Sequence, residues 1–259
     1  MHRKTQEEIA AMRPAGQLVR ECHQIAGSLC KPGVTTAQID AAVDAHIASK
    51  GGIPIFKGVP GPVPFPAATC ISVNEEVVHG IPGDRVLREG DIVSVDIGAS
   101  IDGWCGDSAW TYPVGETDEQ KRKLLQVTES ALMLAIELIP KSRFWSEVAR
   151  EMERLVRRAG FSTVETLVGH GIGHQMHEDP QVPNFVSNSF LRNWDFRLLP
   201  GTVIAVEPMV NAGTKTVRVL SDGWTHVTLD GRPSAHFEHT LGITDHGTVE
   251  ILTGPPAAE

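Results

Sequence analysis

The residues of this chain that could do chemistry are carboxylates and histidines lying inside or beside apolar runs. Asp96 and Asp107 lie on two runs that alternate like β-strands, IVSVDIGAS and CGDSAWTYPV. Glu207 follows the apolar run VIAV, and Glu238 lies within another strand-like run. Because a buried carboxylate without a partner is costly, these four acids predict a compensating positive charge.

The first two acids are brought together by a predicted hairpin. Asp102-Gly103 separates their two runs and is a strong turn signal. If these are the turn residues, position 107 pairs with position 98, which shares a strand face with Asp96. Asp96 and Asp107 are then diagonal neighbours roughly 7–8 Å apart, a spacing that can bracket two metal ions. An isolated pair could simply cap and start two strands, and Glu238 alone could be a surface residue.

Three histidines crowd one glycine-rich segment, GHGIGHQMHEDPQVPN, at residues 169–184. A lone histidine is usually structural, but glycines allow close approach of a ligand here. We assign His170 as a metal ligand, His177 as a group facing the substrate, and His174 as structural. Four converging carboxylates would repel unless cations neutralise them, and two divalent ions balance four charges. Oxygen donors with one imidazole favour ions such as Mn²⁺, Fe²⁺ or Co²⁺ over a thiolate-type zinc site.

Four helices are predicted around these residues from apolar spacings of three and four. The first runs from Ile9 to Leu29, and the second follows a capping box made by Thr35 and Gln38. A capping box of Thr117 with Gln120 is predicted to open the third helix, and residues 144–159 form the fourth, which Gly160 ends.

Strand-like runs follow each pair of helices. The predicted strands are 70–74, 91–101, 105–114, 163–168, 203–210, 217–219, 225–228 and 235–244. The order is two helices and a set of strands, repeated once, which predicts a pseudo-symmetric α+β unit. We expect a single domain over residues 1–254 and a C-terminal tail at 255–259.

Composition excludes several classes of protein. With 259 residues, 41% of them apolar, the chain can bury a substantial core. Its net charge of −9 argues against a general nucleic-acid binder. The polar start MHRKTQEEIA resembles no secretory signal, and no apolar stretch is long enough to cross a bilayer. The four cysteines form no CxxC pair, so free thiols in a reducing cytoplasm are expected.

Five segments together resemble the type I methionine aminopeptidases. They are NEEVVHGIP (74–82), VDIGASIDGWCGDSAW (95–110), GHGIGHQMHEDPQVPN (169–184), AVEPMV (205–210) and DGWTHVTLDGRPSAHFEHT (222–240). They occur in the family's order with similar spacing. The resemblance implies the pita-bread fold, in which two pseudo-symmetric halves enclose a di-metal site.

The resemblance also implies roles for individual residues. Asp96, Asp107, His170, Glu207 and Glu238 match the ligands of two divalent ions, which can be Co²⁺, Mn²⁺, Fe²⁺ or Zn²⁺. His79 and His177 match the catalytic histidines, which contact the substrate, and Glu207 matches the proton acceptor for a water held between the metals. The methionine pocket would be lined by Phe65, Cys70, Met176 and Trp224, although Phe65 and Met176 could equally be core residues.

Three positions depart from the family's usual pattern. Cys105 stands where many relatives carry histidine, Met176 where phenylalanine is common, and His236 where glutamine is common. The five ligands and two histidines are intact, so these changes bear on substrate preference more than on the reaction.

The implied activity is removal of the initiator methionine from peptides and nascent proteins when the second residue is small. The implied enzyme is a cytoplasmic monomer that binds neither nucleic acid nor membrane, and a transient contact with the ribosome is left open. One alternative is a proline-directed peptidase of the same fold, which usually carries an added N-terminal domain; none precedes Ile9. The other is a catalytically silent binding module, which typically loses metal ligands that this chain keeps.

Overall fold

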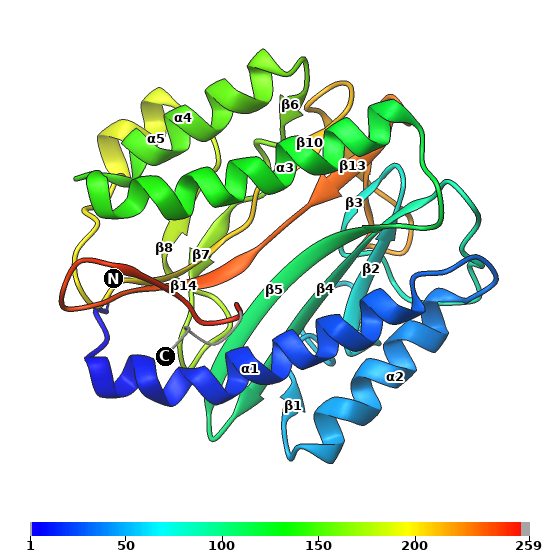
Figure 1. Cartoon of the computed structure of the whole chain (residues 1–259), viewed down its shortest axis with the longest axis horizontal. Coiled ribbons are helices and arrows are strands. Elements are labelled where there is room, and N and C mark those ends of the chain that lie inside the picture. The colour runs from blue at the N-terminus through cyan, green and yellow to red at the C-terminus, as the bar shows by residue number, and fades with distance from the viewer. Residues whose placement is uncertain (1, 255–259) are drawn as a thin grey trace.

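Two pairs of helices cover a curved layer of strands. The computed structural model describes residues 2–254, so the expected tail at 255–259 lies outside the described residues. The helices are α1 (Gln6–Leu29), α2 (Thr36–Ser49), α3 (Glu119–Leu138), the 3-10 helix η1 (Ile139–Lys141), α4 (Trp145–Arg158) and α5 (Asn188–Asn193). Figure 1 shows α1 and α2 along one half of the strands and α3 and α4 along the other.

The first half is built on the predicted hairpin. Its strands are β1 (Ile53–Pro54), β2 (Thr69–Val73), β4 (Ile92–Ile101) and β5 (Trp104–Pro113), and β4 pairs antiparallel with the other three. Asp102 and Gly103 form the turn with φ values of 51° and 78°, the positive region that a tight hairpin turn requires. Gly98 pairs with Asp107, which confirms the predicted register.

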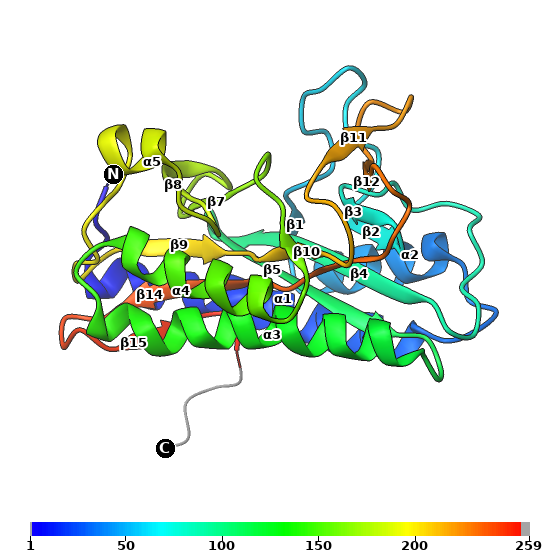
Figure 2. The same ribbon diagram turned by 90° about the horizontal axis from the view of Figure 1, so that it is seen from above.

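The second half contains a five-stranded sheet in the order β15-β14-β9-β7-β8. Two three-stranded sheets, β13-β10-β6 and β11-β12-β3, complete the fold. The bounds are β3 (Glu76–Val78), β6 (Ser162–Thr163), β7 (Gly169–Gly171), β8 (Glu178–Val182), β9 (Val203–Val206), β10 (Met209–Asn211), β11 (Val217–Val219), β12 (His226–Thr228), β13 (Ser234–His236), β14 (His239–Ile243) and β15 (Val249–Ile251). In Figure 2, α1, α3 and α4 lie on one side of the strands, while α5 and β11 project on the other.

Two predicted strands are each interrupted at a glutamate. The run 203–210 is divided into β9 and β10 at Glu207-Pro208, and the run 235–244 into β13 and β14 at Phe237-Glu238. In both places the chain leaves a three-stranded sheet or enters one, and Pro208 has no N–H with which to continue a ladder. Each break frees a glutamate from the regular alternation of a strand.

Two other predictions about the elements are wrong. The third helix is capped by Asp118, which accepts from the Lys121 N–H, and not by Thr117. A carboxylate at this position also interacts favourably with the positive end of the helix dipole. The predicted strand 163–168 reduces to β6, because after Val164, which donates to the Met209 carbonyl, the chain turns away from its neighbour.

Each helix pair packs on its own core. One cluster centres on Trp145, Leu132 and Phe237, and the other on Val19, Ile39 and Val95. The capping boxes of α1 (Thr5 with Glu8) and α2 (Thr35 with Gln38) are formed. All four cysteines are buried and free. Within residues 2–254, no helix combines the length and apolar character needed to cross a membrane.

Candidate metal centre

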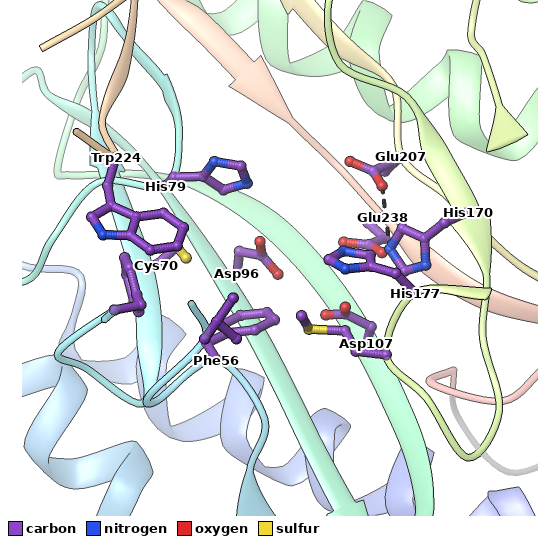
Figure 3. Close-up of a pocket in the computed structure, with 13 residues that line it drawn as sticks. Phe56, Cys70, His79, Asp96, Asp107, His170, His177, Glu207, Trp224 and Glu238 are labelled. Carbon is purple, nitrogen blue, oxygen red and sulfur yellow. Dashed lines mark ion pairs between the residues drawn. The ribbon is translucent and has the colours of Figure 1, made fainter. Parts of the chain in front are cut away.

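The structure brings the five predicted ligands into one cavity on the open side of the strand layer. These residues, Asp96, Asp107, His170, Glu207 and Glu238, are named here the acidic centre, and they come from both halves of the chain. Figure 3 shows their side chains converging, with Asp96 and Asp107 on the hairpin and the other three facing them. Donor atoms of Asp107, His170 and Glu238 all lie within 4.8 Å of one another.

Hydrogen bonds between the halves fix Asp107 against Glu238. The Thr240 hydroxyl donates to the Asp107 carbonyl at 2.8 Å and accepts from the Asp107 N–H at 3.0 Å. The Glu238 N–H donates to the Ala109 carbonyl, and the Ser108 hydroxyl donates to the Glu238 carbonyl. Contacts with the backbone therefore set the positions of two acids that are far apart in sequence, Asp107 and Glu238.

Burial makes the carboxylates of the acidic centre weak acids. It raises the pKa of Asp96 and of Glu207 to about 7, and raises the pKa of Asp107 and of Glu238 well above the ordinary range. Neighbouring carboxylates add to the effect on Asp107 and Glu238. These groups can be ionised together at neutral pH only if positive charge is supplied among them.

Unpartnered atoms support the fit of metal ions to this set. Asp96 Oδ1, Asp107 Oδ1 and Glu238 Oε1 are buried and have no hydrogen-bond partner among the described residues. Buried polar atoms in a folded protein almost always have a partner. Carboxylate oxygens with one imidazole nitrogen are the donors that first-row divalent ions bind.

The tautomer of His170 suits a ligand. Its Nδ1 lies 2.9 Å from the Gly171 carbonyl, so Nδ1 carries the proton and Nε2 is free to bind a metal ion. Nε2 lies 3.6 Å from Glu207 Oε1, which is too long for a hydrogen bond. His170 Nε2 and Glu207 Oε1 are therefore neighbours that do not hydrogen-bond to each other. The ring of His177 meets that of His170 edge to face, with centroids 4.4 Å apart.

His79 lies on the other side of the acidic centre from His177 (Figure 3). It follows β3 with φ of 60°, a backbone conformation that side chains other than glycine rarely adopt. Such strain clusters at functional sites. Burial, and then the nearby His226, lowers the pKa of His79 to about 3, so the ring is neutral at pH 7. Its edge-to-face contact with His226 was not anticipated from sequence.

An apolar pocket adjoins the acidic centre. The predicted residues Phe65, Cys70, Met176 and Trp224 all line the same cavity. The Trp224 indole donates to the Val63 carbonyl at 2.7 Å, and Phe65 packs edge-on against its ring. Phe56 and Val59 also line the cavity and were missed. Phe56 lies just before a Pro/Gly-rich segment and Val59 lies within it, and this segment has no periodicity from which either position could be predicted.

The three unusual positions differ in their surroundings. Met176 lines the pocket, and His236 Nε2 lies 3.6 Å from Glu207 and 3.9 Å from Glu238. The His236 side chain is 2% exposed, and Nε2 has no hydrogen-bond partner within residues 2–254. Cys105 packs instead in a small cluster with Ile9 and outside the cavity. Among the three, Met176 and His236 are thus the ones that can affect the site directly.

Comparison with known proteins gives a consistent result. Residues 10–245 match metallopeptidase family M24. The chain is 46% identical to methionine aminopeptidase 1 of Bacillus subtilis (strain 168) over 96% of its own length and 98% of that relative. It is 38% identical to the methionine aminopeptidase of Escherichia coli (strain K12), over 96% of its own length and 92% of that relative.

Solved structures show the same fold. The crystal structure of methionine aminopeptidase from Thermotoga maritima aligns with a TM-score of 0.92 and 41% identity, over 98% of this chain and 100% of that one. Prolidase from Pyrococcus furiosus aligns with a TM-score of 0.75 at 20% identity, over 98% of this chain and 65% of that one. The prolidase likeness bears on the fold alone, and both together confirm the expected pita-bread fold.

Proposed function

The chain belongs to metallopeptidase family M24, and we propose that it is a metal-dependent aminopeptidase that hydrolyses the N-terminal methionine from peptides and new proteins. The observation that carries this function is the convergence of four carboxylates and one imidazole beside two histidines and an apolar pocket. Relatives of high identity over nearly the whole chain are methionine aminopeptidases, which supports the same reaction here.

The proposed ligands are the five residues of the acidic centre. Bound divalent ions would lower the pKa of a bound water and polarise the scissile carbonyl. Neutralising the buried acids would also remove the main cost of keeping them ionised. Mn²⁺, Fe²⁺, Co²⁺ and Zn²⁺ all suit the donor set, and we propose two ions because four carboxylates balance two divalent charges.

Three side chains carry the remaining chemistry in this proposal. Glu207, which lines the cavity beside His170, accepts a proton from the attacking water. His177 donates a hydrogen bond to the substrate carbonyl as negative charge develops on its oxygen. His79, from the opposite side, contacts the amide nitrogen of the departing residue and orients the peptide.

The pocket residues account for the choice of methionine. A thioether is flexible and polarisable, and it packs well against Phe65, Met176 and the Trp224 ring. We further propose that the second residue of the substrate must be small, that the enzyme is a cytoplasmic monomer of one catalytic domain over residues 1–254, and that it meets nascent chains near the ribosome.

The test measures methionine release from Met-Ala-Ser and from Met-Lys-Ser by chelator-treated protein, with and without added Mn²⁺ or Co²⁺. We expect metal-dependent release from Met-Ala-Ser and at least about 100-fold slower release from Met-Lys-Ser, because a misplaced reacting geometry costs about this factor. A Leu-Pro dipeptide is the control for proline-directed activity. Equal turnover of both methionine peptides would contradict the proposed selectivity, and faster cleavage of Leu-Pro would reassign the substrate.

A further inference from the structure

The loop that carries His177 is held in place by an ion pair from the start of the chain. This segment, residues 173–178, is named here the His177 loop; it follows β7 and includes Glu178, the first residue of β8. Glu178 ends it, and Glu178 Oε2 lies 2.9 Å from Lys4 Nζ. The Lys4 side chain is 3% exposed and that of Glu178 is 20% exposed, so this pair is far more buried than an ordinary surface ion pair.

Lys4 is itself firmly anchored. Its N–H donates to the Gly201 carbonyl at 2.7 Å, and the Gly201 N–H donates to the Ile243 carbonyl in β14. The next residue, Thr5, caps α1 through a complete capping box. The backbone of Lys4 is thus fixed against the second half of the chain, next to β14.

Glu178 connects Lys4 to the middle of the His177 loop. Its Oε1 accepts from the Gln175 N–H at 3.1 Å while Oε2 binds Lys4. Gly173 packs so closely that a Cβ there would lie 2.4 Å from Lys4 Cε and 2.6 Å from Glu178 Oε1. One carboxylate thus fixes the loop at its end and its middle, and His177 lies between these two points.

The opposite side of the loop is held by the hairpin of the first half. The Cys105 N–H donates to the Gly173 carbonyl at 2.8 Å, and the His174 ring stacks on Trp104 with centroids 3.6 Å apart. The His174 Nδ1 also lies 2.7 Å from the Gly103 carbonyl. With the hairpin on one side, the Lys4–Glu178 pair supplies the remaining constraint on His177.

We propose that Lys4 is a positioning residue for catalysis, which acts through Glu178 to hold His177 at the substrate carbonyl. This inference rests on the proposed role of His177. A buried charge pair is seldom the most stable choice for a protein, since the cost of desolvation offsets much of the attraction. The Lys4–Glu178 pair instead fixes the position of His177. This position matters because a displacement of about 1 Å at a reacting group lowers the rate by up to about 100-fold.

The experiment compares Lys4→Met with the wild type on Met-Ala-Ser. We expect kcat to fall by about tenfold with KM changed less than about threefold, since the loop shifts by less than 1 Å. Bound metal should not change, because the pairing of β7 with β9 holds His170, and Glu207 directly follows β9. The matched control is Arg13→Met in α1, the helix that begins just after Lys4. It removes an exposed ion pair with Glu250 and should leave kcat unchanged.

A double-mutant cycle with His177→Ala distinguishes a role of Lys4 in positioning His177 from a general loss of structure. If Lys4 acts through His177, Lys4→Met has no further effect on kcat in the His177→Ala background. An equal loss in both backgrounds, or a wild-type kcat for Lys4→Met, would overturn the proposal. Lys4→Met/Glu178→Gln leaves no unpaired charge and keeps the Gln175 hydrogen bond, so it serves if the single variant does not fold.

Hydrogen exchange of the backbone amides distinguishes this inference from the proposed function. In Lys4→Met, exchange should be faster in residues 173–178 and unchanged in β4 (Ile92–Ile101), whose amides pair with β2 and β5. An inactive wild type with that exchange pattern would refute the aminopeptidase function and leave the Lys4 anchor standing. An active wild type whose loop exchange is unaffected by Lys4→Met would refute the anchor alone.

Discussion

Two carboxylates of the acidic centre lie where a strand ends, and the other two are brought together by the register of a hairpin. Glu207 and Glu238 occupy the two breaks between sheets, where the chain can turn a side chain inward. Asp96 and Asp107 remain on paired strands, and the hairpin register alone brings them together. The geometry of the site therefore depends on one turn and two strand breaks.

The role of His79 can be tested without disturbing the ligands. We expect His79→Ala to keep bound metal and to lose activity by about 100-fold or more, the usual contribution of a positioned acid–base or hydrogen-bonding group. The reason is that the His79 ring lies across the cavity from His170 and takes part in no ligand cluster found among the described residues. Metal content by mass spectrometry of the native protein, together with kcat, measures both effects. Loss of metal in this variant would reassign His79 as a ligand.

The sequence predicted the four carboxylates of the acidic centre because a charged residue in an apolar run is improbable unless it has a function. The same reasoning could not find Phe56, Val59 or the contact of His226 with His79, since they lie on irregular segments or depend on the path of distant chain. It also missed the Lys4–Glu178 pair, whose members are 174 residues apart. Long-range contacts of ordinary residues leave no local pattern.

The elements position the site through close packing of α1 on β5. A Cβ added to Gly106 would lie 2.8 Å from the Gly16 nitrogen and 2.9 Å from the Ala15 carbonyl carbon. Both contacts are with backbone, which cannot move aside as a side chain would. The helix and the strand that carries Asp107 therefore approach as closely as two glycines allow.

Gly106→Ala tests this packing. We expect it to lower the free energy of unfolding by about 1–3 kcal/mol, the usual cost of overpacking a core. Gly83→Ala is the matched control, because a Cβ at Gly83 would meet no atom of the described residues within 4 Å; it should change stability by less than about 0.5 kcal/mol. Urea unfolding followed by fluorescence gives both values. Equal stability of the two variants would show that α1 and β5 separate easily.

Element boundaries were predicted less well than element types, for physical reasons. Thr117 and Asp118 are both good N-caps, and only the packing of α3 on its core decides between them. The runs 203–210 and 235–244 are rich in residues that favour strands, and although Pro208 interrupts the first, their division between two sheets depends on tertiary pairing. The pairing of β4 with β5 was predictable because its turn residues fix the register locally.

At the scale of the molecule, the acidic centre is the meeting point of two separately packed halves. Asp96 and Asp107 belong to the half covered by α1 and α2, and the other three ligands to the half covered by α3 and α4. Repulsion among the four acids opposes the closure of the halves, and bound cations would reverse it. Metal binding should therefore stabilise the whole fold, and not only the site.

This coupling predicts an unusual pH dependence for the metal-free protein. Folding raises the pKa of Asp96 and Glu207 to about 7, above their ordinary values near 4. Between about pH 4 and pH 7 the unfolded chain has lost these protons while the folded protein keeps them. These two acids therefore contribute a loss of stability as the pH rises through this window, whereas buried histidines such as His79, whose pKa folding lowers, contribute a gain up to about pH 6.5.

Thermal unfolding of chelator-treated protein between pH 5 and pH 7.5 measures the effect. Over this range we expect the Tm of the wild type to fall relative to that of Asp96→Asn, by about 2–4 °C for each kcal/mol that Asp96 contributes in a chain of this size. Added Mn²⁺ at 100 times its Kd should restore about 2.7 kcal/mol per site, and more effectively at the higher pH, since metal competes with protons for the same carboxylates. Asp96→Asn removes one titrating carboxylate, so the difference between the two metal-free profiles isolates its contribution. A difference in Tm between wild type and Asp96→Asn that does not change with pH would mean that Asp96 is not buried among the other acids in solution.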